Sequence, residues 1–206
     1  MNYYIILTII IYYLVNYKET LDYLYSFKYK TVDFRLITNK IYINGEVTTG
    51  NSKINIKYLN SLNKNKPIYI IINSNGGSFF GGYLFIQKIK SLQKQKIEIN
   101  CIAIDASSIA FDIFQSCNKK YITNKTKMMQ HDLIVKFNGT ITEFEEMYDF
   151  LDIFKELNNY LVKTIMKRSN LTQSEYNKLI KNEWSINGHE EIMKYNLADE
   201  IINFYE

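Results

Sequence analysis

The chain has 206 residues, 47% of them hydrophobic, so it is long enough to bury a core and is not a wholly disordered chain. Its net charge of +4 comes from 25 basic and 21 acidic residues spread along the chain, which gives no strong nucleic-acid-binding signal. The cysteines, Cys101 and Cys117, are too few for a disulfide scaffold and form no metal-ligand spacing with His131 and His189. The composition therefore predicts a globular protein in a reducing compartment, without a metal site.

The N-terminal segment is apolar, and residues 3–15 carry no charge. A transmembrane helix needs about 20 residues, so even residues 3–17 are short for one. A signal peptide would need a basic start and a small-residue cleavage site, and neither is evident. Two interpretations stay open: residues 3–17 contact a membrane, or they pack on the body or on a neighbouring subunit. We expect residues 1–30 to form an apolar extension and residues 31–206 one domain.

The first half of that domain alternates predicted strands and helices along the chain. The expected elements are a short helix over 32–38, a strand over 40–47, a turn over 48–52, a helix over 54–62, a strand from Ile68 and a helix over 82–92. The strand from Ile68 is an apolar, β-branched run that breaks into Asn73-Ser74-Asn75-Gly76-Gly77-Ser78. Glycine tolerates positive φ and has no Cβ, so N–H groups of this turn can approach a ligand and stabilise an oxyanion. An ordinary strand-to-helix turn is the alternative.

The second half continues the alternation and ends with several helices. The expected elements are a buried strand over 97–104, a short helix over 106–117, short strands over 121–123 and 127–130, a long helix over 141–167, a short helix capped by Thr172, a helix over 190–195 and a strand over 199–204. Thr140 and Glu143 form a capping-box pattern before the long helix. At about 40 Å, that helix is longer than a domain of this size needs, so its outer part is predicted to pack against another subunit. The alternation predicts an α/β fold with a parallel sheet.

Three polar segments follow the inferred core strands: the glycine turn, Ala106-Ser107-Ser108-Ile109-Ala110 and Met128-Met129-Gln130-His131. The carboxyl ends of parallel strands converge on one crevice, so we expect these segments to meet. A serine at a helix N-terminus gains from the helix dipole, although it needs a base to become a good nucleophile. Taken singly, Ser108 could be a helix N-cap and His131 a buried, hydrogen-bonded histidine.

In these segments the chain resembles the Clp protease proteolytic subunit, a serine peptidase built as stacked rings. The family's Asn-Ser-Pro-Gly-Gly-Ser, Ala-Ala-Ser-Met, Met-Ile-His-Gln-Pro and Glu-Ala-x-x-Tyr-Gly-Leu-x-Asp motifs are matched, in this order, at 73–78, 106–109, 129–133 and 191–199. The resemblance covers about residues 32–204. It implies a Clp/crotonase-type α/β fold of repeated β-β-α units, with the helix over 141–167 as the handle that joins two rings.

Carried over residue by residue, the resemblance implies that Ser108 is the nucleophile and His131 the general base. The N–H groups of Gly77 and Ile109 would form the oxyanion hole. Ser107 is the weaker nucleophile candidate, because it matches the family's small alanine.

The third triad member departs from the family, which has an aspartate shortly before an aromatic residue. Here the segment reads Lys181-Asn182-Glu183-Trp184-Ser185. Asn182 fits the spacing to Trp184, and Glu183 fits the count from Thr172. An asparagine can hold a histidine by a hydrogen bond but cannot stabilise the imidazolium by its charge, and the corresponding change in another serine protease lowers turnover about 10⁴-fold.

The resemblance implies a serine endopeptidase that degrades unfolded polypeptides within an oligomeric ring. It implies that this chain binds no cofactor and that ATP is used only by a partner AAA+ unfoldase. It also implies a cytoplasmic, stromal or matrix location, and an N-terminal membrane tether stays open. The alternative is a weakened or non-catalytic structural subunit of a mixed Clp ring. Two further rivals are a membrane-associated serine–lysine peptidase of the same fold and a crotonase-type acyl-CoA enzyme, which would need no serine beside the oxyanion hole.

Overall fold

The computed structural model describes residues 30–32, 36–134 and 144–204. The apolar stretch 3–17 and the capping-box pair Thr140 and Glu143 lie outside these residues, so the predictions for them stay predictions. Within the described residues no helix is long and apolar enough to cross a membrane. The elements, in chain order, are β1 Lys30–Val32, β2 Lys40–Asn44, α2 Thr49–Ser61, β3 Ile68–Ser74, α3 Phe79–Lys94, β4 Ile99–Ser107, α4 Ile109–Gln115, β5 Lys119–Gln130, α5 Phe144–Met166, α6 Gln173–Ile180, β6 Trp184–Asn187, α7 His189–Lys194 and β7 Glu200–Phe204.

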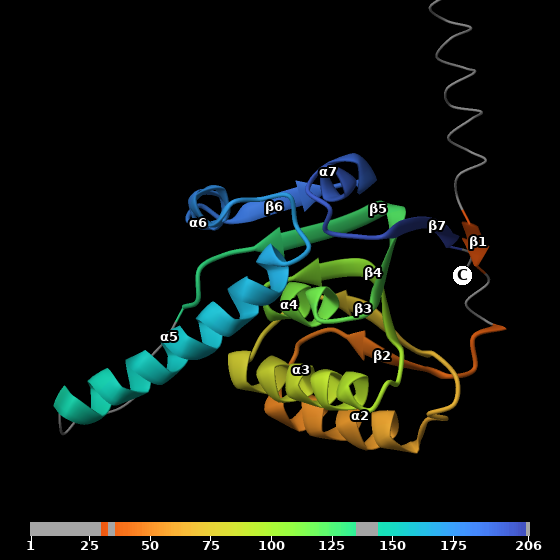
Figure 1. The fold of residues 1–206 in the computed structure, drawn as a ribbon, viewed down its shortest axis with the longest axis horizontal. Helices are drawn as coiled ribbons and strands as arrows, with labels where there is room; N and C mark the ends of the chain where they lie inside the picture. The colour runs from red at the N-terminus through yellow and green to blue at the C-terminus, as the bar shows by residue number, and fades with distance from the viewer. Residues whose placement is uncertain (1–29, 33–35, 135–143, 205–206) are drawn as a thin grey trace, which may run out of the picture.

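The strands form a mostly parallel sheet in the order β1-β7-β5-β4-β3-β2, with β6 joined to β5 (Figure 1). Each neighbouring pair along that order is parallel, whereas β6 runs antiparallel to the last part of β5. Helices α2 and α3 lie below the strands in Figure 1, α4 is drawn level with β3, and α5 projects from the body as an arm. This arrangement is the mixed α/β fold with a mostly parallel sheet that the alternation predicts.

Burial on both faces explains why the central strands read as continuous apolar runs. Ile70 and Ile72 of β3 belong to the large core, which also contains Phe85 of α3 and Phe111 of α4. Ile71 points to the opposite face, where it belongs to a smaller cluster with Ile102, Tyr121 and Ile202. Apolar side chains therefore pack on both faces of the sheet. The carboxyl ends of β3, β4 and β5 lie side by side at one edge.

Helix α2 starts earlier than predicted. The prediction of a short helix over 32–38 is wrong at its first residue, which belongs to β1. The side chain of Thr48 accepts a hydrogen bond from the N–H of Asn51, so the residues expected to turn already form the first turn of α2. Val32 is a strand residue, because β1 pairs with β7 from the far end of the chain. That pairing cannot be read from local periodicity.

Two boundaries near the predicted site also differ from expectation. The helix predicted over 106–117 begins at Ile109, because Ala106 and Ser107 continue β4: Ala106 pairs with β3 and β5, and Ser107 pairs with β5. The two short strands expected over 121–123 and 127–130 are one strand, β5, with a register shift against β4. Neighbouring strands on both sides keep the chain extended through polar residues that lack a strand pattern.

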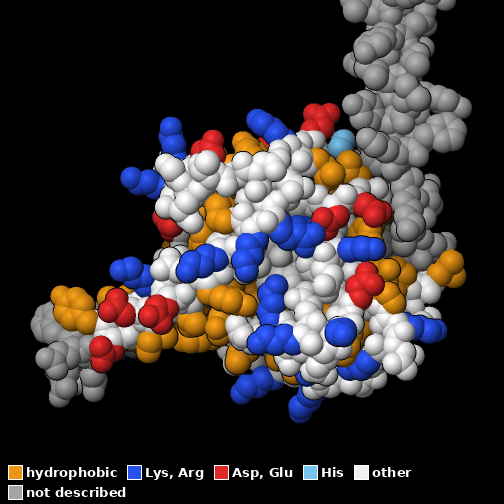
Figure 2. Space-filling model, viewed as in Figure 1, with side chains coloured by type: hydrophobic (Ala, Val, Ile, Leu, Met, Phe, Trp, Pro, Cys, Tyr) orange, Lys and Arg blue, Asp and Glu red, His pale blue; other side chains and the backbone are white. Residues whose placement is uncertain are grey.

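Helix α5 is a 23-residue helix with a strong apolar stripe, in agreement with the predicted long helix. Its inner part packs on α3 through Phe154, whose ring centroid lies 5.4 Å from that of Phe79 and 4.9 Å from that of Phe80. Tyr148 and Ile153, nearer its start, are exposed. Hydrophobic side chains gather where the arm meets the body, while Lys and Arg are scattered over the viewed face (Figure 2).

The C-terminal elements are fixed by local caps and by contacts with the sheet. Thr172 caps α6 in a full capping box with Glu175, as its position predicted. Strand β6, which the sequence analysis missed, follows directly and pairs with β5. Cys101 and Cys117 form a disulfide bond, which disagrees with the reducing compartment predicted from the composition. The two cysteines meet because the chain returns through α4 to the start of β5 beside β4.

Candidate active site

The glycine turn is held in a strained shape by Val47. The N–H of Val47 donates to the carbonyl of Gly76, and the N–H of Ser78 donates to the carbonyl of Val47, each at 2.7 Å. Gly76 and Gly77 have φ of 90° and 140°, a region that favours glycine. A Cβ at Gly76 would lie 2.6 Å from the carbonyl oxygen of Ser107. The turn therefore needs glycine in order to approach the end of β4. The two hydrogen bonds between the turn and Val47 do not involve the N–H of Gly77.

Ser108 joins β4 to α4 in an unusual conformation. Its φ is 54° and its ψ is −129°, and its side chain makes no capping hydrogen bond. Its N–H donates to the carbonyl of Met129 at 2.8 Å, which ties it to β5. A positive φ at a residue other than glycine costs about 1–3 kcal/mol and is found most often at functional sites. The hydroxyl is therefore not occupied as a helix cap, and the N–H of Ile109, first in α4, has no acceptor within the helix.

His131 follows the last residue of β5 and is half-buried. Its Nδ1 atom lies 2.6 Å from the carbonyl oxygen of Asp132, and its backbone N–H donates to Oε1 of Gln130 at 3.2 Å. A carbonyl only accepts hydrogen bonds, so Nδ1 carries the hydrogen and Nε2 keeps its lone pair. In that tautomer the ring can accept a proton at Nε2, as a general base must.

One cavity of about 470 Å³ brings the predicted residues together. Ser108, His131, Gly77 and Ile109 all contribute to its wall. They come from the carboxyl ends of three adjacent strands, as the topology predicts. The other residues that line the cavity are Asn75, Ser78, Phe79, Asp112, Gln130, Leu133, Ile134 and Asn158. The cavity thus holds a hydroxyl, an imidazole and two backbone N–H groups, which is the set needed for acyl transfer.

A buried carboxylate also lines this cavity, and the sequence analysis did not identify it. Asp112 is 7% exposed, and Nε2 of Gln130 lies 3.1 Å from both of its oxygens. Burial raises the pKa of Asp112 to about 7, and the hydrogen bond from Gln130 opposes that rise only in part. Gln130 therefore links Asp112 to the backbone of His131. The sequence signal was an acidic residue inside the apolar run Ile109-Ala110-Phe111-Asp112-Ile113-Phe114.

Asn182 and Glu183 lie in the turn between α6 and β6, and both are exposed. Neither lines the cavity. Trp184 pairs with Gln130 in the antiparallel ladder, so this turn comes just beyond the end of β5, where His131 lies. The choice between Asn182 and Glu183 as the third member stays a prediction.

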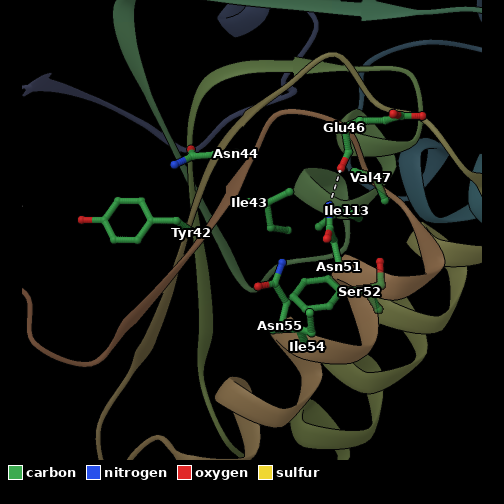
Figure 3. A pocket seen from close by; sticks show the side chains of 11 residues that line it. Tyr42, Ile43, Asn44, Glu46, Val47, Asn51, Ser52, Ile54, Asn55 and Ile113 are labelled. Atoms are coloured by element: carbon green, nitrogen blue, oxygen red, sulfur yellow. Dashed lines mark hydrogen bonds between the residues drawn. The ribbon is translucent and has the colours of Figure 1, made fainter.

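A second cavity, of about 270 Å³, lies between β2 and the first turns of α2 (Figure 3). Tyr42, Asn51 and Ile54 are among its lining residues. In its wall, Nδ2 of Asn51 donates to the carbonyl of Glu46 at 3.3 Å. None of the predicted site residues lines it, so the chemistry expected from the sequence belongs to the first cavity.

Comparison with known proteins agrees with the fold. The Clp protease family model matches residues 26–204, which is most of the chain. The chain is 23% identical, over 138 residues, to the ATP-dependent Clp protease proteolytic subunit 2 of Borreliella burgdorferi; the match covers 65% of this chain and 70% of that protein. The matched region contains β1 to β7 and the whole cavity with Ser108 and His131. The chain therefore belongs to the Clp protease family, and its fold is of the Clp/crotonase type.

Proposed function

We propose that this chain is a serine endopeptidase subunit that cleaves unfolded polypeptides. The observation that carries the proposal is the meeting of Ser108, His131, Gly77 and Ile109 in one cavity. The unused hydroxyl of Ser108 and the Nδ1–H tautomer of His131 add to it. Among the residues that the structure describes, no lysine lines the cavity, which speaks against the serine–lysine alternative.

In the proposed reaction, Oγ of Ser108 attacks the carbonyl carbon of the scissile peptide bond while Nε2 of His131 takes the hydroxyl proton. The developing oxyanion accepts hydrogen bonds from the N–H groups of Gly77 and Ile109, and each such donor is worth about 3 kcal/mol in comparable sites. His131 then gives its proton to the leaving amine, and an acyl-enzyme remains on Ser108. A water molecule, deprotonated by the same histidine, hydrolyses the ester and restores the hydroxyl.

The assembly follows from the family and from α5. We propose that the helix over 141–167 joins subunits into a ring, and that a partner AAA+ ATPase uses ATP to feed unfolded chains into it. Exposed Tyr148 and Ile153 supply apolar surface on that helix. The chain itself needs no cofactor for the reaction above, and the proposed setting is the cytoplasm or an organelle stroma or matrix. Contact of residues 3–17 with a membrane stays a prediction.

A fluorophosphonate probe, whose phosphorus forms a bond with an activated serine hydroxyl as fluoride leaves, tests the proposal. We expect labelling of the parent chain and of Ser107→Ala, and none of Ser108→Ala or His131→Ala. Ser107 is a matched control because it is the adjacent serine, and its Oγ donates to the carboxylate of Asp105 at 3.1 Å. An unlabelled parent chain, under conditions where an active Clp peptidase reacts, would overturn the proposal.

A second candidate function is a non-catalytic structural subunit of a mixed Clp ring. The observation in its favour is the position of Asn182 and Glu183, which are exposed and outside the cavity wall. It predicts that the unlabelled chain co-assembles with an active subunit. Labelling of Ser108 would exclude it.

A further inference from the structure

Asp112 stands one helical turn beyond Ser108 on α4, about 6 Å further along the axis at 1.5 Å per residue. Both residues line the same cavity. A peptide whose scissile carbonyl lies at Ser108 therefore places an adjacent side chain within reach of Asp112. Asp112 therefore contributes to the wall of the cavity in which the proposed substrate would lie.

No cation balances the charge of Asp112 among the described residues. Its hydrogen bonds come from the neutral amide of Gln130, and no Lys or Arg forms an ion pair with it in the parts of the chain that are described. A carboxylate has about four acceptor positions, so further donors can be accommodated. Carboxylates are rarely buried without a partner, because desolvation of the charge is expensive.

Side chains from several neighbouring elements surround Asp112. Gln130 comes from β5 and Tyr176 from α6. Burial raises the pKa of the Tyr176 hydroxyl, and the negative charge of Asp112 adds to that rise. His131 and Asn158, from the end of β5 and from α5, line the cavity with it. His131 is the one group in this set that can become a cation, and the proposed reaction uses it as a base.

We propose that Asp112 is a specificity-determining residue that favours peptides carrying Lys or Arg in the cavity beside Ser108. This inference rests on the proposed peptidase function. Phe79, Ile109 and Leu133 supply apolar wall for the methylene stem of such a side chain. The ammonium or guanidinium group then supplies the cation that Asp112 lacks. A neutral apolar side chain gains the wall contacts but leaves the carboxylate unpaired.

A different role for Asp112 makes a different prediction. If its carboxylate serves only to orient Gln130 and, through it, the backbone of His131, then its loss slows hydrolysis of every substrate by the same factor. A role in specificity instead changes the ratio between a basic and a neutral substrate.

Two fluorogenic peptides that differ only in Lys or norleucine before the scissile bond provide the test, because norleucine keeps the apolar stem and removes the ammonium group. We expect kcat/KM of the parent chain at pH 8 to be at least about 10-fold higher for the Lys peptide. In Asp112→Asn the ratio should fall to near one. Asp105→Asn should keep the parent ratio, because it removes a carboxylate near the end of β4, the strand before α4, that is outside the cavity wall.

The parent chain alone can overturn the inference, whether or not the variant folds. A ratio near one in a parent chain whose Ser108 is labelled overturns the role of Asp112 and leaves the peptidase proposal standing. An equal loss for both peptides in Asp112→Asn, with the ratio kept, overturns it in favour of the orienting role.

A binding measurement covers the case in which neither peptide is cleaved and the peptidase proposal has failed. Butylguanidinium should then raise the Tm of the parent chain and of Asp105→Asn but not of Asp112→Asn, whereas the neutral butylurea should raise none. That result would support the cation site without catalysis. No shift of the parent chain with butylguanidinium would overturn the inference as well.

Discussion

Nδ1 of His131 lies 2.6 Å from the backbone carbonyl oxygen of Asp132, the next residue in the chain. This contact holds the ring in the tautomer that a general base needs, which is one of the two tasks of a triad carboxylate. A carbonyl carries only a partial charge, so it performs the second task, stabilisation of the imidazolium, much less well. In the proposed active site a carbonyl, and not a carboxylate, therefore holds Nδ1 of His131.

Substitution Asn182→Asp should restore that charge, if Asn182 is the third member. We expect the second-order rate constant for fluorophosphonate labelling of Ser108 to rise about 10-fold or more, since the reverse change lowers turnover about 10⁴-fold in another serine protease. Asn187→Asp, which adds the same charge at an exposed position of β6, is the matched control. An unchanged rate in Asn182→Asp would argue against Asn182, and a fall in Glu183→Gln would favour Glu183.

Substitution Gly76→Ala should remove most reactivity of Ser108. The new Cβ would lie 2.6 Å from the carbonyl oxygen of Ser107 and 2.7 Å from Cβ of Ser108, so the turn must move away from the nucleophile. Loss of one oxyanion donor alone lowers turnover about 10²–10³-fold. Gly45→Ala separates displacement from backbone strain, because Gly45 also has a positive φ of 71° but has open space around its Cβ position. Equal labelling rates in Gly76→Ala and the parent chain would contradict this account of the turn.

Substitution Asp112→Asn should change the pH dependence of stability. The folded-state pKa of about 7 lies above the reference value of 3.8, so the folded state binds more protons between these pH values and stability falls as pH rises from about 4 to about 7. Relative to the parent chain, the variant should gain stability over that window, by up to about 4 kcal/mol above pH 7. Urea unfolding at pH 4 and pH 8 measures the difference. A gain that is the same at both values would show that the carboxylate does not titrate in this range.

Substitution Ile153→Lys should weaken the proposed ring. Ile153 is a large apolar residue of α5 that is 53% exposed, and a charge there opposes burial against another subunit. Native mass spectrometry should show smaller assemblies than those of the parent chain, with the subunit still folded by circular dichroism. Asp152→Lys, a charge change at the neighbouring exposed position, is the control. Identical assemblies in Ile153→Lys and the parent chain would contradict the role of α5.

The local sequence pattern was sufficient to predict an element where the residues of that element alone determine its structure. The β-branched run before the glycine turn predicted β3, and Thr172 predicted the start of α6. Pattern failed where a distant strand decides the conformation, as at Val32, which pairs with Phe204, and at β6, which pairs with β5. The polar stretch within β5 stays extended for the same reason.

The order of short motifs in the sequence determined the family. It also predicted Ser108, His131, Gly77 and Ile109 as site residues, because each motif is a local arrangement at the end of one strand. Only the tertiary structure decided what else surrounds them. It placed Asp112 in the same cavity, joined to Gln130 from 18 residues further along the chain, and it set the carbonyl of Asp132 against His131. These contacts depend on how strands and helices pack, which no local pattern of residues encodes.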